Sequence, residues 1–186
     1  MVTLILGGSG SGKSAFAEDF ITKENIDCKK YYLATMKTGD DPETKKRIER
    51  HRMMRKEKGF LTIEQPYDIW DCLDRIDRDS VILLEDLSNL LANEMFLKKR
   101  LTVIEEPEEE IEEEIENGIT ALSNHSANLV IVSNNIFEDG IEYDEETKRY
   151  MKALGELNRR IAGHSDEVYE VVCGIPVSLK QKTRQS

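Results

Sequence analysis

A short apolar run, Val2–Leu6, leads directly into the sequence Gly7-Gly-Ser-Gly-Ser-Gly-Lys-Ser14. The spacing Gly-x4-Gly-Lys-Ser is that of a phosphate-binding P-loop, and a strand before it and a helix after it are the setting that this loop requires. Its glycines allow backbone N–H groups to turn around an anion. A glycine-rich loop that fits the pattern by chance is the alternative, but the strand in front of it favours nucleoside triphosphate binding.

Each part of this loop has an expected task. Lys13 would reach the β- and γ-phosphates and offset the charge that develops there, which makes it a catalytic candidate. Ser14 would ligate Mg²⁺, and the following helix would present the positive end of its dipole. The residues expected to contact the nucleotide are Gly7, Gly8, Ser9, Gly10, Ser11, Gly12, Lys13 and Ser14.

The composition predicts a cytoplasmic protein of one domain, residues 1–186. An apolar stretch of about 20 residues is lacking, so we expect no stable membrane insertion. A strand that begins at residue 2 leaves no room for a signal or transit peptide. The three cysteines have no metal-ligand spacing, which disfavours zinc and is typical of reduced thiols.

The net charge of −11 comes mainly from one segment, because nine of the twelve residues Glu105–Glu116 are glutamates. No basic stripe offsets this acid, so nucleic-acid binding is not expected. Apolar residues recur inside the segment at helical spacing, which predicts an acidic amphipathic helix over about residues 104–123 with one dry stripe and an otherwise solvated surface. The residues of that stripe are Ile104, Ile111, Ile115, Ile119 and Leu122.

Short apolar runs alternate with longer charged segments of helical periodicity. The pattern predicts an α/β fold, a P-loop NTPase-like three-layer α/β/α domain with a mostly parallel sheet. The expected strands are Val2–Leu6, Tyr31–Ala34, Val81–Leu84, Leu129–Val132 and Val168–Val172, with a small additional one at Leu61–Glu64. The expected helices are Ser14–Lys23, Pro42–Lys58, Tyr67–Asp74, Ser88–Lys99, Glu108–Ser123 and Glu145–Ala162.

Ligands of such sheets bind at the carboxyl ends of the strands, so the polar residues there are site candidates. Val81-Ile-Leu-Leu-Glu85-Asp86 is similar to a Walker B strand, in which a terminal carboxylate holds Mg²⁺ beside the P-loop hydroxyl. A surface turn after a buried strand is the alternative. Paired with the P-loop, the pattern favours Glu85 over Asp86 as the second metal ligand.

A second cluster is cationic. Arg47, His51 and Arg55 are spaced i, i+4 and i+8, so a helix would place them on one face. A neutral imidazole between phosphate-binding arginines could attack an α-phosphorus and form a phosphoramidate. A basic surface that contacts solvent or an acidic partner would explain the segment equally well.

Taken in order, these motifs resemble those of the bifunctional adenosylcobinamide kinase/adenosylcobinamide-phosphate guanylyltransferases of cobalamin synthesis. The resemblance spans almost the whole chain, and the combination of His51 with the closing pattern is more specific than the P-loop. It rests on the loop at residues 7–14, Tyr32-Leu-Ala-Thr35, Arg47-Ile-x-x-His51-x-x-x-Arg55, Thr62-x-Glu64, Leu83-Leu-Glu85, Asn93, Val132-Ser-Asn134, Leu154-Gly155-x-x-Asn158-x-x-Ile161-Ala162 and Asp166-Glu-Val-Tyr-x-Val-Val-x-Gly174-Ile175-Pro-Val.

The resemblance implies two reactions. In the first, the aminopropanol hydroxyl of adenosylcobinamide is phosphorylated by GTP or ATP. In the second, GTP transfers GMP to His51, and adenosylcobinamide phosphate takes the GMP to give adenosylcobinamide-GDP. The resemblance also implies a homo-oligomer, a trimer in the family. Besides the P-loop, its implied nucleotide contacts are Ala34, Thr35, Met36, Arg52, Met53, Met54, Arg55, Glu64 and Glu85.

This chain departs from the family pattern at two places. It has Arg50-His51 where many relatives have two histidines, and it has Asn135 where relatives often have a glutamate in Asn-Glu-Val-Gly. The second departure leaves the kinase half open. Two other functions stay open at this point: a different P-loop small-molecule kinase whose His51 only helps to clamp phosphate, and a nucleotide-dependent regulatory protein whose acidic helix recruits a basic partner.

Overall fold

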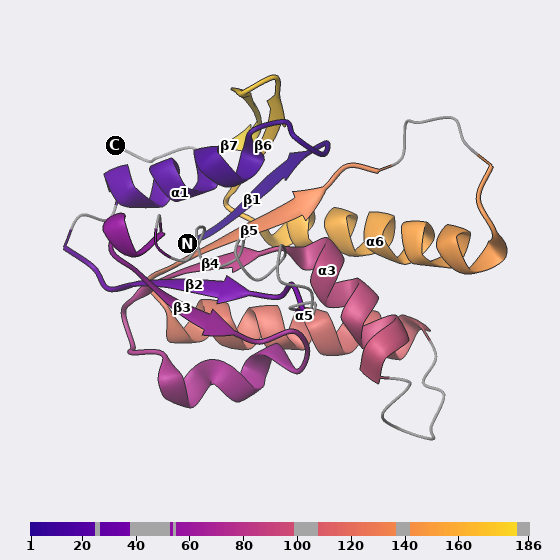
Figure 1. Cartoon of the computed structure of the whole chain (residues 1–186), viewed down its shortest axis with the longest axis horizontal. Coiled ribbons are helices and arrows are strands. Elements are labelled where there is room, and N and C mark those ends of the chain that lie inside the picture. The colour runs from indigo at the N-terminus through magenta and orange to yellow at the C-terminus, as the bar shows by residue number, and fades with distance from the viewer. Residues whose placement is uncertain (25–26, 38–52, 54, 99–107, 137–141, 182–186) are drawn as a thin grey trace.

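Seven strands form one sheet in the computed structural model, which describes residues 1–24, 27–37, 53, 55–98, 108–136 and 142–181 (Figure 1). The strands are β1 (Val2–Gly7), β2 (Lys30–Ala34), β3 (Phe60–Glu64), β4 (Val81–Glu85), β5 (Asn128–Asn134), β6 (Glu167–Val172) and β7 (Ile175–Gln181). The helical elements are α1 (Lys13–Glu24), η1 (Ile69–Arg75), α3 (Leu87–Ala92), η2 (Asn93–Lys98), α5 (Glu108–His125) and α6 (Glu145–His164).

The strand order is β3-β2-β4-β5-β1-β6-β7, and only β7 runs antiparallel to its neighbour. The predicted mostly parallel sheet is therefore confirmed, with each predicted strand within a residue or two of its observed bounds. The central strands are buried on both faces, as near-continuous apolar runs require. This order puts the carboxyl ends of β4, β5, β1 and β6 side by side.

Helices cover both faces of the sheet, which gives the predicted three layers (Figure 1). Ala17 and Ile21 of α1 pack on one face, against residues such as Ile5 and Val132. On the other face η1, α3, α5 and α6 bury a larger apolar cluster around Leu4 and Leu84. Among the described residues, no helix is long and apolar enough to cross a membrane.

Two predicted α-helices differ from the structure. The expected Tyr67–Asp74 helix is the 3-10 helix η1, because Asp68 has a left-handed backbone and the Gln65 side chain holds the carbonyls of Tyr67 and Asp68. The expected Ser88–Lys99 helix begins one residue earlier and changes to the π-helical turn η2 at Asn93. Of the expected Pro42–Lys58 helix, only Met53 and residues 55–58 are described; Met53 and residues 55–57 have helical backbone, and Lys58 lies in a turn.

The acidic segment forms α5, and four residues of its predicted stripe are buried: Ile111, Ile115, Ile119 and Leu122. Ile104 lies outside the described residues. The expected solvated acidic surface needs a correction, because Glu112 is buried and pairs with Arg160 of α6 at 3.3 Å. Glu116 approaches the same guanidinium at 3.7 Å. Part of the negative charge therefore joins α5 to α6.

β7 was not predicted. Its seven residues are all exposed, so it has no apolar run of the kind that marks the central strands. It pairs with β6 through the two-residue turn Cys173-Gly174, in which both residues have positive φ. Such a turn matches the twist of a two-stranded hairpin. Pro176 is acceptable in this strand because it lies at the edge of the sheet.

Two helical glycines provide a matched test of the packing. A Cβ on Gly118 of α5 would lie 2.7 Å from Cγ1 of Ile69 and 3.2 Å from the Trp70 ring, whereas a Cβ on Gly163 of α6 would meet nothing within 4 Å. We expect Gly118→Ala to lower the free energy of unfolding by about 1–3 kcal/mol through overpacking. Gly163→Ala should instead raise it by up to about 1 kcal/mol through helix propensity. Urea denaturation of both variants measures the difference, and equal effects would contradict this packing.

Candidate functional site

The P-loop connects β1 to α1 at the centre of the sheet, because β1 lies between β5 and β6. Lys13 is nearly buried, and its Nζ donates a hydrogen bond of 3.1 Å to the carbonyl of Gly8 within the loop. An ammonium that folds over the loop in this way lies where a phosphate would be held. Lys13 and Ser14 are the first residues of the twelve-residue helix α1, whose free N–H groups and dipole favour an anion.

The turn of the β6–β7 hairpin packs against the P-loop. The N–H of Gly174 donates to the carbonyl of Ser11 at 2.8 Å, and a Cβ on Gly12 would lie 3.2 Å from the Cα of Gly174. Gly12 itself has a φ of +90°, a conformation that side chains disfavour. The close approach of the two backbones explains the glycine at position 12, whereas the positive φ of 78° explains the glycine at position 174. The hairpin thus fixes the shape of the phosphate loop.

Glu85 ends β4 and faces the loop. The hydroxyl of Ser14 donates to Oε1 of Glu85 at 2.6 Å, while Oε2 is buried and has no hydrogen-bond partner among the described residues. Burial raises the pKa of Glu85 to about 7, and nearby Asp86 adds to this, whereas the Ser14 hydrogen bond and the Lys13 charge oppose it. The hydroxyl of Ser14 and the two carboxylate oxygens of Glu85 form a donor set that fits Mg²⁺.

Asp86, the next residue, has a different task. Its carboxylate caps α3 by accepting hydrogen bonds from the Asn89 N–H at 2.7 Å and the Ser88 hydroxyl at 2.6 Å. Asn134 at the end of β5 donates to the other oxygen at 3.3 Å. Both oxygens of the Asp86 carboxylate therefore accept hydrogen bonds from the protein, whereas Oε2 of Glu85 accepts none from the described residues.

Thr35 follows β2 and is completely buried. Its hydroxyl bonds to the N–H and the carbonyl of Asp86, each at 2.8 Å, and the Asn93 amide donates to its carbonyl. These bonds join the ends of β2 and β4, so Thr35 positions the site through its neighbours. Ala34 and Met36 flank it, and Met36 is half exposed, so a bound molecule can reach it.

Arg55 is the described part of the predicted cationic cluster. Its guanidinium stacks on the Tyr32 ring at 3.8 Å from the ring centroid, and its Nε is buried without a hydrogen-bond partner among the described residues. Burial raises the pKa of Tyr32 and the Glu85 carboxylate adds to this, whereas the Arg55 guanidinium opposes it. Met53 is 64% exposed. The predicted site residues His51, Arg52 and Met54, and also Arg47, lie outside the described residues.

Glu64 lies farther from the P-loop. It ends β3, which is separated from β1 by β2, β4 and β5. At about 4.8 Å per strand, four spacings put it roughly 19 Å away along the sheet edge. A contact of Glu64 with the nucleotide therefore requires a ligand that extends across the ends of three strands.

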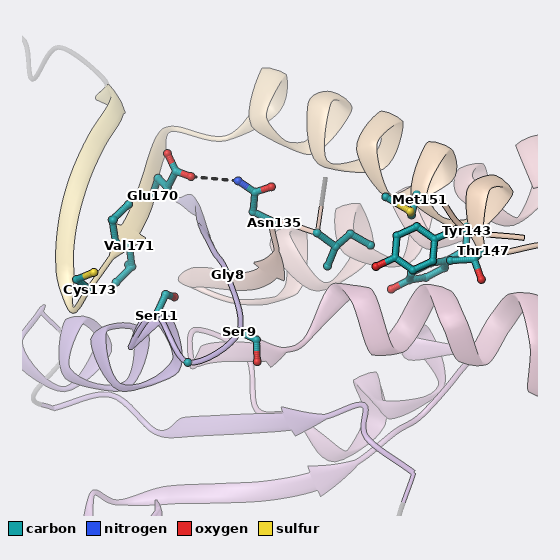
Figure 2. A pocket seen from close by; sticks show the side chains of 14 residues that line it. Gly8, Ser9, Ser11, Asn135, Tyr143, Thr147, Met151, Glu170, Val171 and Cys173 are labelled. Atoms are coloured by element: carbon teal, nitrogen blue, oxygen red, sulfur yellow. Dashed lines mark hydrogen bonds between the residues drawn. The ribbon is translucent and has the colours of Figure 1, made fainter. Parts of the chain in front are cut away.

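A cavity of about 790 Å³ opens on the other side of the loop (Figure 2). The tip of the P-loop, the end of β6 and the first half of α6 enclose it. Tyr150, one of its apolar walls, donates to the carbonyl of Ser88 at 3.0 Å, and burial raises its pKa to about 12. The lining residues are Gly8, Ser9, Gly10, Ser11, Asn135, Ile136, Tyr143, Thr147, Tyr150, Met151, Glu170, Val171, Val172 and Cys173.

Sequence reasoning missed two parts of this arrangement. Glu170 lines the cavity, but within β6 it reads as one polar residue of an exposed face. Gly174 is part of the family pattern quoted above, but the sequence alone gives no physical reason for a glycine at that position. The local signal for the hairpin turn is the glycine itself, which stands between two apolar runs and favours the positive φ of a tight turn.

The fold is shared with two solved structures. A KaiC-like protein from Pyrococcus horikoshii is 13% identical with a TM-score of 0.55, and the match covers the whole of this chain and 81% of that one. The flagellar accessory protein FlaH from Methanocaldococcus jannaschii is 14% identical with a TM-score of 0.51, over 97% and 78% of the two chains. At such identities the likeness shows the fold alone.

Sequence comparisons find nearer relatives. The bifunctional adenosylcobalamin biosynthesis protein CobU of Escherichia coli K12 is 30% identical over 97% of this chain and all of that protein. Its namesake in Salmonella typhimurium LT2 is 29% identical with the same coverage. The bifunctional adenosylcobalamin biosynthesis protein CobP of Pseudomonas aeruginosa PAO1 is 29% identical over 97% of this chain and 98% of its own length.

The decisive comparison is with a family model. The model described as cobinamide kinase/cobinamide phosphate guanyltransferase matches residues 3–179, from the first residues of β1 to within β7. The matched region thus contains the P-loop, Glu85, Arg55 and the hairpin that supports the loop. This chain therefore belongs to the cobinamide kinase/cobinamide phosphate guanyltransferase family of enzymes.

Proposed function

We propose that this protein phosphorylates the hydroxyl of adenosylcobinamide and then transfers GMP from GTP to the resulting phosphate, giving adenosylcobinamide-GDP. The family match over residues 3–179 supports the choice of substrate. The observation that carries the phosphate chemistry is the P-loop, where Ser14 and Glu85 face each other at 2.6 Å beside a buried Lys13. A cytoplasmic homo-oligomer, a trimer by resemblance to the family, is part of the same proposal.

Lys13 and the loop amides would bind the triphosphate and lower the energy of charge that builds up on it during transfer. On binding, the Lys13 ammonium would exchange the Gly8 carbonyl for phosphate oxygens. In the kinase step the acceptor oxygen forms a bond to the γ-phosphorus, and the bond to the β–γ bridging oxygen breaks. Because the loop is fixed by the hairpin at Gly174, its amides are preorganised for this charge.

Ser14 and Glu85 would hold Mg²⁺. The unpartnered Oε2 of Glu85 supports this, because a buried carboxylate oxygen without a partner is unfavourable unless a cation or proton satisfies it. The metal would supply neutralisation of phosphate charge. Asp86 would remain a structural cap, since its oxygens already accept three hydrogen bonds.

The second reaction would use His51 as a covalent nucleophile. Its imidazole nitrogen would attack the α-phosphorus of GTP, the α–β anhydride bond would break, and pyrophosphate would leave. An oxygen of the cobinamide phosphate would then displace His51 from the same phosphorus. Splitting the transfer in this way keeps a good leaving group at each displacement.

Arg55 supports this second reaction. A buried guanidinium with an unpaired Nε, stacked on Tyr32 four residues beyond His51 in the chain, is suited to an anionic ligand. Its stacking also fixes the described helical residues 55–57 against the sheet. Arg52, Met53 and Met54 stay predicted nucleotide contacts, as do Ala34, Met36 and Glu64, whereas the completely buried Thr35 would act by positioning its neighbours.

The raised pKa of Glu85 predicts a pH-dependent stability in the absence of metal. In the folded state the carboxyl would keep its proton up to about pH 7, whereas in the unfolded chain it ionises near 4.5. The folded state therefore holds more protons in this window, and the free energy of unfolding should fall as pH rises from about 5 to 8. Through Glu85, the free energy of unfolding should fall by at most about 3 kcal/mol over this pH range. Glu85→Gln should lack this contribution to the pH dependence.

Chemical denaturation at pH 5 and pH 8, with EDTA and with Mg²⁺, measures this effect. Mg²⁺ at pH 8 should stabilise the natural protein and leave Glu85→Gln unchanged. An identical pH dependence for the two proteins would contradict the assigned environment of Glu85.

The histidyl intermediate has a direct test. Incubation with α-³²P-GTP and Mg²⁺ should leave on the denatured protein a label that is acid-labile and alkali-stable, and His51→Ala should abolish it. The matched control is His164→Ala, since the His164 side chain is 80% exposed at the end of α6 and should not affect labelling.

Label that survives in His51→Ala would refute the intermediate. Label from γ-³²P-GTP would indicate a phosphorylated protein and a different mechanism.

Chromatography of the products from adenosylcobinamide, and separately from its phosphate, distinguishes the two proposed reactions. Static light scattering tests the trimer.

A further inference from the structure

The cavity beside the P-loop lies away from Glu85. In the strand order β4-β5-β1-β6, Glu85 ends β4 on one side of the loop, and the cavity is walled by β6 on the other (Figures 1 and 2). A nucleotide whose phosphates lie in the loop beside Lys13 and Glu85 would occupy only the end of the cavity at Gly8–Ser11 and leave the part toward α6 for a second molecule. A second molecule bound there would reach the loop tip at Gly8–Ser11 from the side of β6 and α6.

The walls of the cavity suit a large ligand with much apolar surface. Ile136, Tyr150, Met151 and Val172 supply apolar contact. The hydroxyl of Ser11, another lining residue, is buried without a hydrogen-bond partner among the described residues. A pocket with apolar walls and a few polar groups at one end is the usual form of a small-molecule site.

Glu170 supplies the one acidic side chain among the described lining residues. Its backbone pairs in register with Leu6, the residue before the P-loop. Strand alternation puts its side chain on the same face as Val168, which packs in the cluster that contains α6 residues. Its side chain lines the cavity beside Asn135, as Figure 2 shows.

Asn135 holds this carboxylate in place. Its Nδ2 donates to Oε1 of Glu170 at 3.2 Å, and its backbone N–H donates to the carbonyl of Gly7 at 3.0 Å. Asn135 thus connects the start of the P-loop to Glu170. By the resemblance described above, it is also the position at which a glutamate is expected.

We infer that the cavity binds the acceptor alcohol of the phosphoryl transfer and that Glu170 contacts its attacking hydroxyl, in place of a carboxylate at position 135. This assignment rests on the proposed kinase function. The acceptor class is a large amphiphilic alcohol, with its hydroxyl toward Glu170 and Ser11 and its apolar surface against Tyr150 and Met151.

The chemical step is a proton transfer coupled to phosphoryl transfer. The acceptor oxygen forms a bond to the γ-phosphorus, its proton passes to the Glu170 carboxylate, and the nucleoside diphosphate leaves with the electrons of the broken P–O bond. The guanylyl step has no such need, because its acceptor is an already ionised phosphate. The two reactions should therefore respond differently to loss of Glu170.

The test separates the two reactions in one set of variants. Glu170→Gln keeps a group that can bond to Asn135, so the fold should persist. We expect kcat for phosphorylation of adenosylcobinamide to fall about 10²-fold or more, with the KM for nucleotide within twofold of the natural value. Transfer of GMP to preformed adenosylcobinamide phosphate should stay within about threefold.

A carboxylate exchange provides the rescue. The double variant Asn135→Glu/Glu170→Gln puts the carboxylate back at position 135 and should recover at least tenfold in kcat over Glu170→Gln. The matched control is Glu167→Gln, on the opposite face of β6 beside Tyr169, which should leave both reactions unchanged. Met151→Trp, which fills the cavity, should weaken adenosylcobinamide binding at least tenfold in calorimetry and leave nucleotide binding unchanged.

The outcomes are distinct. Full kinase activity in Glu170→Gln, or an equal loss of both reactions without rescue, would overturn the role of Glu170 while the proposed function stands. Unchanged adenosylcobinamide binding in Met151→Trp would overturn the cavity assignment. A natural protein that phosphorylates no adenosylcobinamide would overturn the proposed kinase function, and the Glu170 assignment with it.

Discussion

The position of β1 between β5 and β6 is the constraint on which the rest of the site depends. Parallel pairing on both sides buries β1 and makes its carboxyl end the centre of a row of strand ends. The P-loop starts at that point, so every neighbour of the loop is set by this order. β5 and β4 bring Asn134 and Glu85 to one side, and β6 brings Glu170 and the turn at Gly174 to the other.

Several polar groups around the loop are buried with part of their bonding capacity unused. Oε2 of Glu85, Nε of Arg55 and Oγ of Ser11 have no hydrogen-bond partner among the described residues. Such groups cost folding free energy unless a proton, cation or ligand satisfies them, which is the role proposed for the ligands of this site. By contrast Asp86, Thr35 and Asn93 are fully used within the protein and keep the strand ends in place. The site thus separates groups that bind from groups that position.

Much of the fold could be predicted because burial imposes a visible pattern. The central strands are continuous apolar runs, and the stripe of α5 recurs at helical spacing, since each must bury one surface. β7 was not predicted, and η1 was predicted as a helix but not as a 3-10 helix, for the opposite reason. β7 buries no side chain, and η1 owes its form to the left-handed Asp68 and to contacts from Gln65. An element that buries no side chain, or whose form depends on a few side-chain hydrogen bonds, is not marked by an apolar pattern in the sequence.

The same division applies to the site. The sequence by itself determined the phosphate loop and pointed to Glu85, because a glycine loop and a strand-end carboxylate are local requirements of binding a triphosphate with its metal. Only the tertiary structure decided that Glu85 and not Asp86 meets Ser14, that Gly12 must approach Gly174 without a side chain, and that Glu170 lies against Asn135. These contacts join residues 35 to more than 160 positions apart, so they follow from the order of the strands in the sheet, which no local pattern encodes.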